Sequence, residues 1–265
     1  MRALGMSCGP MPAKGPGLTD DAILGGKLRL LQPQRGHRFG HDAVLLAAAV
    51  PARPGQQAIE LGAGVGAAGL ALLARVPGLR LSMVEIEPAL AKLADENIAR
   101  NGFSEQARAL NLDVAAPARN FAARGLYSGM ADHVFMNPPF NDASQQASPD
   151  SLRRVAHRAS KDNFSTWLRA ATLLLRPAGM LTLIWRSDGL GDILSALSPG
   201  YGAVTILPVH PDADKPAIRA IVRAVKASRA PMSILPGFVL NEDGAASASA
   251  ERVLRGAEAL PPPPT

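Results

Sequence analysis

Short apolar runs alternate with longer segments of helical character through the middle of the chain. The apolar runs lie at residues 58–61, 79–84, 132–136 and 180–185, and the segments with helical spacing or helix-boundary residues lie at 67–74, 88–101 and 163–175. Short runs that are predominantly apolar are typical of strands buried on both faces of a parallel sheet. The alternation therefore predicts an α/β fold with a doubly wound sheet.

The segment before this alternation predicts smaller elements. Residues 1–20 are rich in proline and glycine, and we expect them to be mobile. Residues 21–34 carry a glycine pair between apolar stretches, which predicts a short hairpin. A helix is expected to follow, capped by Asp42 or by the neighbouring His41.

The segment after the alternation predicts two more strands and a tail. Residues 204–207 and 217–227 have strand character and are expected to form a closing antiparallel hairpin. Residues 242–265 are rich in glycine and alanine, end in prolines and threonine, and are expected to be disordered. These boundaries leave one folded domain over residues 21–241.

A glycine-rich turn follows the first apolar run. Gly62, Gly64 and Gly66 occupy every second position, and a helix is expected to begin directly after them. Glycine lets the backbone take a positive φ and approach a ligand closely, and the free N–H groups of a helix start can bind it. Glu85 ends the next strand roughly 20 positions later, the spacing of an acid that binds ribose hydroxyls. A nucleoside-containing ligand is therefore indicated, although a tight turn without any ligand is the simpler alternative.

Four motifs in order resemble those of class I S-adenosylmethionine-dependent methyltransferases. They are Glu60-x-Gly-x-Gly-x-Gly, Val84-Glu-Ile-Glu87, the third-strand segment Ala109–Val114, and Asn137-Pro-Pro-Phe140 after the fourth strand. The last resembles the catalytic motif of enzymes that methylate a planar amide or aromatic amino nitrogen. The resemblance implies a Rossmann-like sheet of seven strands with an antiparallel closing hairpin, and S-adenosylmethionine as cofactor.

The same resemblance implies a role for each motif residue. Gly62, Gly64 and Gly66 would lie beneath the cofactor, Glu85 would bind its ribose, Asp113 would bind its adenine, and Glu60 would engage the methionine end or organise the loop. The stretch Arg38-Phe39-x-x-Asp42-Ala43 resembles a segment of the tRNA (adenine-N6) methyltransferases that modify the base next to the anticodon of valine tRNA. There the segment helps to close over the cofactor, which makes Asp42 a candidate cofactor residue; a plain helix cap is the alternative.

The tetrapeptide at residues 137–140 suits the chemistry of an aromatic amine. The lone pair of such an amine is conjugated with its ring, so the Asn137 side-chain oxygen and the Pro138 carbonyl can accept its N–H groups and stabilise the charge that develops. Pro138 and Pro139 stiffen the backbone, and Phe140 offers a stacking face worth about 1–3 kcal/mol. An ordinary turn after a strand is the alternative, since Asn-Pro often starts turns.

The charge of the chain adds a candidate partner. Its 28 Lys and Arg exceed its 22 Asp and Glu, giving +6 and a pI near 10.0, which suits a polyanionic partner. A basic group follows the tetrapeptide, and its members are Arg153, Arg154, Arg158 and Lys161. We expect these side chains to contact RNA phosphates, with a solvated helix face as the alternative.

Other classes of protein are disfavoured. Cys8 is the single cysteine, so an intrachain disulfide and a cysteine-built metal site are excluded, and His157 lacks a partner at metal-ligand spacing. The longest apolar stretch, residues 43–50, is too short to span a bilayer. A soluble, cytoplasmic protein without metal is expected, and the sequence leaves its oligomeric state open.

Taken with the resemblance, these features predict methyl transfer to N6 of an adenine in tRNA, in an anticodon loop where the base is readily unstacked. Asn-Pro-Pro also occurs in enzymes that methylate glutamine N5 of release factors and guanine N2 of ribosomal RNA. Phe140 and the short segment before the glycine motif favour a nucleobase over glutamine, and the absence of a duplicated domain disfavours the guanine enzymes. A catalytically silent scaffold that binds cofactor or RNA is the non-enzymatic alternative.

Overall fold

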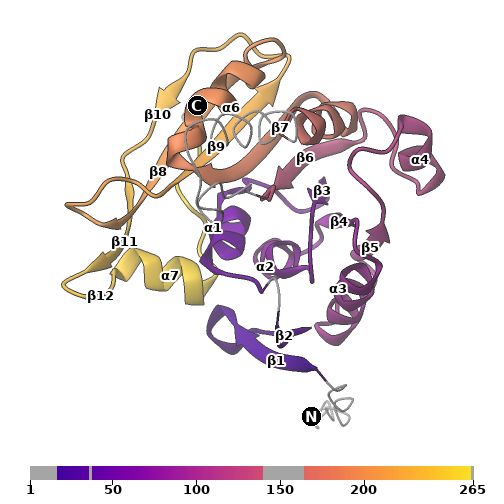
Figure 1. The fold of residues 1–265 in the computed structure, drawn as a ribbon, viewed down its shortest axis with the longest axis horizontal. Helices are drawn as coiled ribbons and strands as arrows, with labels where there is room; N and C mark the ends of the chain where they lie inside the picture. Colours follow the sequence, from indigo (N-terminus) through magenta and orange to yellow (C-terminus); the bar gives the residue numbers. More distant parts are fainter. Residues whose placement is uncertain (1–16, 36–37, 140–163, 264–265) are drawn as a thin grey trace, which may run out of the picture.

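The main sheet of the computed structural model, which describes residues 17–35, 38–139 and 164–263, has ten strands (Figure 1). Its parallel half has the order β7-β6-β3-β4-β5. These strands are β3 (Gln57–Leu61), β4 (Arg80–Glu85), β5 (Ala107–Asn111), β6 (Ala131–Met136) and β7 (Leu175–Arg186). The order reverses between β3 and β6, the switch point at which doubly wound sheets bind ligands.

The closing hairpin is confirmed, and the sheet continues beyond it. Strand β9 (Arg219–Lys226) pairs in antiparallel fashion with β7 on one side and with β8 (Tyr201–Asp212) on the other. The seven strands that were predicted are present in the expected α/β architecture. Three short strands extend the sheet from the long edge of β8, namely β10 (Ser233–Ile234), β11 (Phe238–Glu242) and β12 (Ala245–Ala246).

Helices cover both faces of this sheet and bury an apolar core on each side. One face carries α1 (His41–Ala49), α2 (Ala67–Arg75), α3 (Pro88–Arg100) and α7 (Ala248–Gly256); the other carries α4 (Ala118–Ala123), the helical residues 164–174 and α6 (Leu190–Leu197). Alternate side chains of one strand enter opposite cores: Ala58 packs in the first, Ile59 and Leu61 in the second. This explains why Ala58, Ile59 and Leu61 of this strand are all apolar. None of the helices in the described ranges has the length and apolar content of a membrane span.

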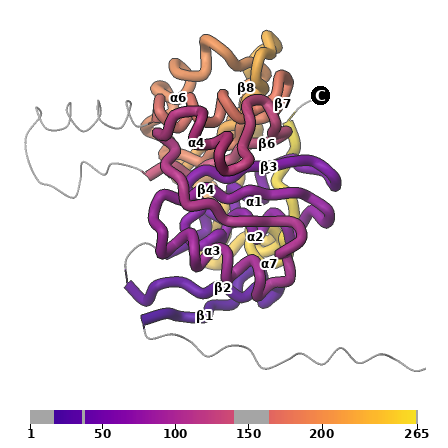
Figure 2. The backbone as a smooth tube through the Cα atoms, turned by 90° about the vertical axis from the view of Figure 1, so that its right-hand side faces the viewer, coloured from indigo at the N-terminus to yellow at the C-terminus, as the bar shows by residue number. Residues whose placement is uncertain are grey.

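The predicted N-terminal hairpin is present as a separate two-stranded sheet. It consists of β1 (Leu18–Ile23) and β2 (Leu28–Pro33), joined by a 3-10 turn with Gly25 at φ +65°. β1 thus begins inside the segment that was expected to be mobile. Figure 2 shows the hairpin as an outer layer, separated from the main sheet by helices, and β2 contacts α2 and α3.

The expectation of a disordered tail is wrong for the described residues after Asn241. They form the end of β11, then β12 and α7, whose first turn is capped by the Ser247 hydroxyl. Ala250 and Val253 are buried against the first core, and the Leu260 N–H donates to the Ala48 carbonyl of α1. The buried Arg223 guanidinium donates to the carbonyls of Ala49 and Pro261, at 2.7 Å each. The alanine-rich composition concealed an amphipathic helix with these partners.

Candidate functional site

The motif residues meet at the carboxyl ends of the parallel strands. Leu61 of β3 pairs with Met136 of β6 on one side and with Val84 of β4 on the other. Gly62, Asn137 and Glu85, the next residue of each chain segment, therefore lie at one edge of the sheet, at its switch point. Open α/β sheets bind their ligands at this position. The structure thus brings together three of the motifs that the sequence analysis selected.

The three glycines of the loop have positive φ for different reasons. Their φ values are +70° at Gly62, +57° at Gly64 and +88° at Gly66. A Cβ at Gly64 would meet no atom of the described residues within 4 Å, whereas at Gly66 it would lie 3.2 Å from the Met83 sulfur. At Gly62 it would lie 2.8 Å from Cζ3 of Trp167 and closer still to Cη2. Open space for a ligand thus lies over Gly64, while the other two glycines permit close packing.

Glu85 holds the glycine loop through its side chain. The N–H of Gly64 donates to one carboxylate oxygen at 2.7 Å, and the N–H of Glu87 donates to the other at 2.9 Å. The residue is 7% exposed at the end of β4. Each carboxylate oxygen has a second lone pair, so it can still accept a hydroxyl from a ligand. The predicted ribose contact is compatible with this geometry and stays a prediction.

Glu60 is a buried acid beneath α2. It is 4% exposed, and its Oε2 has no hydrogen-bond partner among the described residues. A Cβ at Gly69 of α2 would lie 2.6 Å from this oxygen, so the glycine makes room for the carboxyl group. Burial, together with the nearby charge of Glu85, raises the pKa of Glu60 to about 8. This position favours organisation of the loop and helix over contact with the methionine end.

The raised pKa of Glu60 predicts a pH-dependent stability. The native state holds a proton that the unfolded state, with its ordinary value of 4.5, has lost, so the free energy of unfolding falls as pH rises from about 4.5 to 8. The slope is at most ~1.4 kcal/mol per pH unit. Glu60→Gln should remove this component, as measured by denaturant unfolding at pH 5 to 8, while Glu105→Gln at an exposed position should keep it. If the free energy of unfolding had the same pH dependence in the wild type and in Glu60→Gln, the raised pKa of Glu60 would be refuted as its cause.

Asn137 presents an unpaired acceptor at the end of β6. Its side-chain Oδ1 is buried and has no hydrogen-bond partner within the described part of the chain. Pro138 is also buried, whereas Pro139 is exposed. A buried acceptor without a partner costs about 1–3 kcal/mol, so an N–H donor supplied by a ligand would be favourable here. Phe140 and the predicted RNA contacts Arg153, Arg154, Arg158 and Lys161 lie outside the described residues.

Two further candidates lie at the same edge with other partners. The Asp42 carboxylate forms an ion pair with Arg219 of β9 at 2.8 Å, and the N-cap of α1 is Gly40 without a side-chain cap. The expected capping by Asp42 or His41 is therefore wrong, because Asp42 lies within the first turn. Asp113 is exposed two residues after β5, where its carboxylate accepts from the Ala115 N–H at 2.8 Å.

Sequence reasoning missed two residues that contact the glycine loop. Trp167 is 8% exposed and packs on Gly62, and the buried Asn97 side chain donates to the Val65 carbonyl at 3.0 Å. The Asn97-x-x-x-Asn101 spacing at the end of the segment expected to be helical was a usable signal for the second of them. The open space over Gly64, the Glu85 carboxylate and the unpaired Asn137 oxygen together fit a nucleoside-containing cofactor with an amine-bearing substrate beside it. The described residues contain no cluster of His, Cys, Asp or Glu suited to a metal ion.

A family model for the methyltransferase small domain matches residues 37–191, more than half of the chain. Among curated proteins, a tRNA1(Val) (adenine(37)-N6)-methyltransferase of Porphyromonas gingivalis is 31% identical over 161 residues, which cover 59% of this chain and 61% of the relative. The Shewanella protein of the same name is 29% identical over 163 residues, covering 62% and 66%. The chain thus spans a little under two thirds of the length of these relatives.

Solved structures show the same architecture. One described as a predicted O-methyltransferase, protein Atu636 from Agrobacterium tumefaciens, is 28% identical with a TM-score of 0.70, covering 83% of this chain and 98% of that one. The TYW2 structure from P. horikoshii is 14% identical, with a TM-score of 0.53 over 82% of this chain and 74% of that one, and supports the fold alone.

Proposed function

The chain belongs to the methyltransferase small domain family, and from this we propose that it transfers a methyl group from S-adenosylmethionine to N6 of an adenine in tRNA. The observation that carries the proposal is the buried Oδ1 of Asn137 beside the glycine loop, which has no hydrogen-bond partner among the described residues. It supplies an acceptor for an amino N–H at the position where the sheet can also hold a nucleoside-containing cofactor. The matched relatives whose names specify an adenine-N6 activity support the choice of base.

The residues of the site can perform this reaction by orientation and by charge stabilisation. When bound, the cofactor supplies an electrophilic methyl group, and Gly62, Gly64 and Gly66 would hold it with Glu85 and Asp113. The Asn137 oxygen and the Pro138 carbonyl would each accept one N–H of the adenine amine, and the base would stack on Phe140. These acceptors stabilise the positive charge on the attacking nitrogen, whose acidity then lets a proton leave to water. No strong general base is required.

A tRNA substrate is supported by charge and by geometry. The chain has a net charge of +6, and neutralised phosphates contribute much of the affinity for nucleic acid. The adenine must leave its stack to reach Asn137, and an anticodon loop allows this at low cost. We therefore place the target base in that loop.

Methyl transfer from labelled S-adenosylmethionine to total tRNA, total ribosomal RNA and a release factor, followed by nucleoside analysis, tests the proposal. N6-methyladenosine in tRNA is the expected product. Label in guanosine or in the release factor would contradict the proposed substrate but support S-adenosylmethionine as the cofactor. Cofactor binding without label in any substrate would support the silent scaffold instead.

The basic group after the tetrapeptide gives a separate prediction. Reversing Arg153 and Arg158 to glutamate should weaken tRNA binding and reduce the slope of log affinity against log salt, because phosphate contacts release counterions. Filter binding at several salt concentrations measures both quantities. The double reversal of Arg252 and Arg255 on α7 introduces the same charge change elsewhere and serves as the control. Equal losses in both variants would assign the effect to net charge alone.

A further inference from the structure

We propose that Asn97 is a positioning residue for the glycine loop, and that through it the N-terminal hairpin helps to set the affinity for the cofactor. The second part rests on the proposed function, because it assumes that the loop binds S-adenosylmethionine. The first part concerns only the conformation of residues 62–66. Neither part requires Asn97 to touch the cofactor.

The Asn97 side chain connects the hairpin to the glycine loop directly. Its Oδ1 accepts from the Leu31 N–H at 2.8 Å, and its Nδ2 donates to the Leu31 carbonyl at 2.9 Å and the Val65 carbonyl at 3.0 Å. The residue is 0% exposed, so water cannot replace these bonds. Both amide hydrogens are thereby used, one on each partner. Val65 lies between Gly64 and Gly66, so its peptide orientation determines how the loop faces a ligand.

Asn101 repeats the hairpin contact one helical turn later without reaching the loop. Its Oδ1 accepts from the Arg29 N–H at 2.9 Å, and its Nδ2 donates to the Arg29 carbonyl at 2.8 Å. Its Nδ2 also donates to the Asn97 carbonyl at 2.7 Å. Asn97 and Asn101 of α3 thus bond the backbone of alternate residues of β2, which a neighbouring strand would otherwise do. Asn101 is therefore a natural control for the contact with the hairpin alone.

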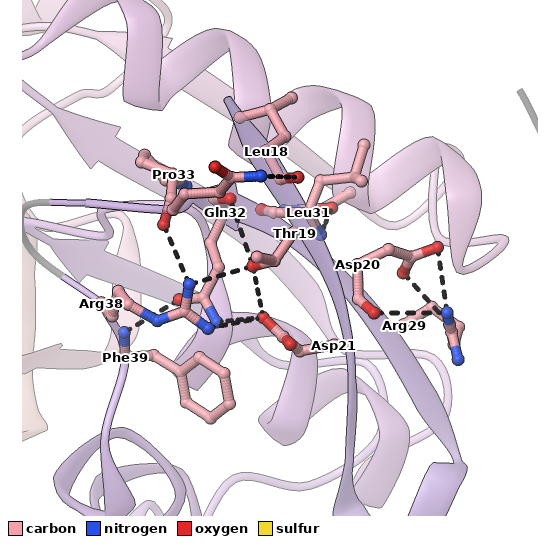
Figure 3. Close-up of polar contacts among 12 residues, drawn as sticks. Leu18, Thr19, Asp20, Asp21, Arg29, Leu31, Gln32, Pro33, Arg38 and Phe39 are labelled. Atoms are coloured by element: carbon pink, nitrogen blue, oxygen red, sulfur yellow. Dashed lines mark hydrogen bonds and ion pairs between the residues drawn. The ribbon is translucent and has the colours of Figure 1, made fainter. Parts of the chain in front are cut away.

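The hairpin also holds the chain segment that leads into α1 (Figure 3). Gln32 is 1% exposed; its Nε2 donates to Asp21 at 2.6 Å, and its Oε1 accepts from the Phe39 N–H at 3.2 Å. Arg38 donates to Asp21, to the Thr19 hydroxyl and to the Pro33 carbonyl. Phe39 packs against the first core, which includes Val65. The hairpin is thus fixed both by α3 and by the segment before α1, and a displacement of Val65 would break its bond to the Asn97 side chain.

A fixed hairpin favours one loop conformation before the cofactor arrives. Glu85 holds the loop through the Gly64 N–H, and Asn97 holds it through the carbonyl of the following residue, Val65. Val65 lies between Gly64 and Gly66. Glycines lose more conformational freedom than other residues when they become ordered. If Asn97 no longer holds the loop, the loop must become ordered when the cofactor binds. The dissociation constant of S-adenosylmethionine then rises. We expect an increase of at least tenfold.

The test compares Asn97→Ala with Asn101→Ala in the full chain. Three quantities are measured for each variant: the melting temperature, the S-adenosylmethionine dissociation constant by titration calorimetry, and hydrogen exchange of the peptide covering residues 62–66. Both variants should melt at lower temperature because both lose bonds to β2. Only Asn97→Ala should show at least tenfold weaker binding and faster exchange in the loop. The proposal would be overturned if both variants showed equal changes in affinity and exchange, or if residues 62–66 exchanged at the wild-type rate in both.

A second variant covers a failure of Asn97→Ala to fold. Asn97→Leu has a similar volume, introduces no buried charge and removes the bonds to Leu31 and Val65, so it should give the same contrast with Asn101→Leu. If the wild-type chain binds no S-adenosylmethionine, the proposed function fails, yet the exchange contrast still decides whether Asn97 fixes the loop. If the wild type binds it and the contrast is absent, this inference alone fails.

Discussion

Asn137→Ala should lower kcat by about 10²–10³-fold while leaving the dissociation constant of S-adenosylmethionine nearly unchanged. Asn137 directly follows β6, and its side-chain oxygen is a buried acceptor with no partner among the described residues. The proposed partner of this oxygen is the substrate amine. An interaction that stabilises the charged transition state affects turnover more than cofactor binding. Single-turnover methyl transfer and calorimetric titration of the cofactor measure the two effects separately.

The control for Asn137 is an asparagine outside the site. Asn241 of β11 donates to the Pro211 carbonyl at 2.8 Å and lies in the extension of the sheet. Asn241→Ala should change stability without a comparable loss of kcat. A parallel loss of cofactor affinity and turnover in Asn137→Ala would show that this side chain supports the loop rather than the reacting amine.

Gly62→Ala should destabilise the fold by about 3 kcal/mol or more, whereas Gly64→Ala should cost only the ~1–2 kcal/mol of a left-handed alanine. Both positions have positive φ, but only Gly62 has the Trp167 indole in the space of a Cβ. Gly64→Ala should instead reduce cofactor affinity, because it fills the open space over the loop. Denaturant unfolding and calorimetric titration of both variants measure this contrast.

A double-mutant cycle assigns the cost at Gly62 to its neighbour. In the Trp167→Leu background, Gly62→Ala should cost less than in the wild type, because the smaller side chain leaves room for the Cβ. A coupling energy near zero would show that the strain at Gly62 comes from its backbone conformation alone.

Local patterns allowed most of the parallel sheet to be predicted. Strands buried on both faces are predominantly apolar. Gly62, Glu85 and Asn137 lie at or directly after the carboxyl ends of β3, β4 and β6, so the edge at which they meet was predictable from their order. The closing hairpin followed from the same reasoning. The Asn137 motif was found because it lies immediately after β6.

Features that depend on distant partners were not predictable. Asp42 was expected to cap α1, but its ion-pair partner Arg219 lies 177 positions away. Asn97 had the spacing of a helix stop, and its bonds to Leu31 and Val65 became visible only when the hairpin was placed on α3. Composition also misled at the C-terminal end, where small residues form α7 because Ala250 and Val253 find an apolar surface.

The contacts between α1 and the C-terminal segment have a consequence for the order of folding during synthesis. The carbonyls at the end of α1 accept hydrogen bonds from Arg223 and Leu260, and α7 packs against the same helix. A ribosome makes α1 before it makes these partners. A nascent chain that ends before α7 would leave an apolar flank of α1 open to water and the Arg223 guanidinium without its Pro261 acceptor. Helix α1 therefore completes its packing only after α7 has been synthesised, and until then its apolar flank is a surface that chaperones can bind.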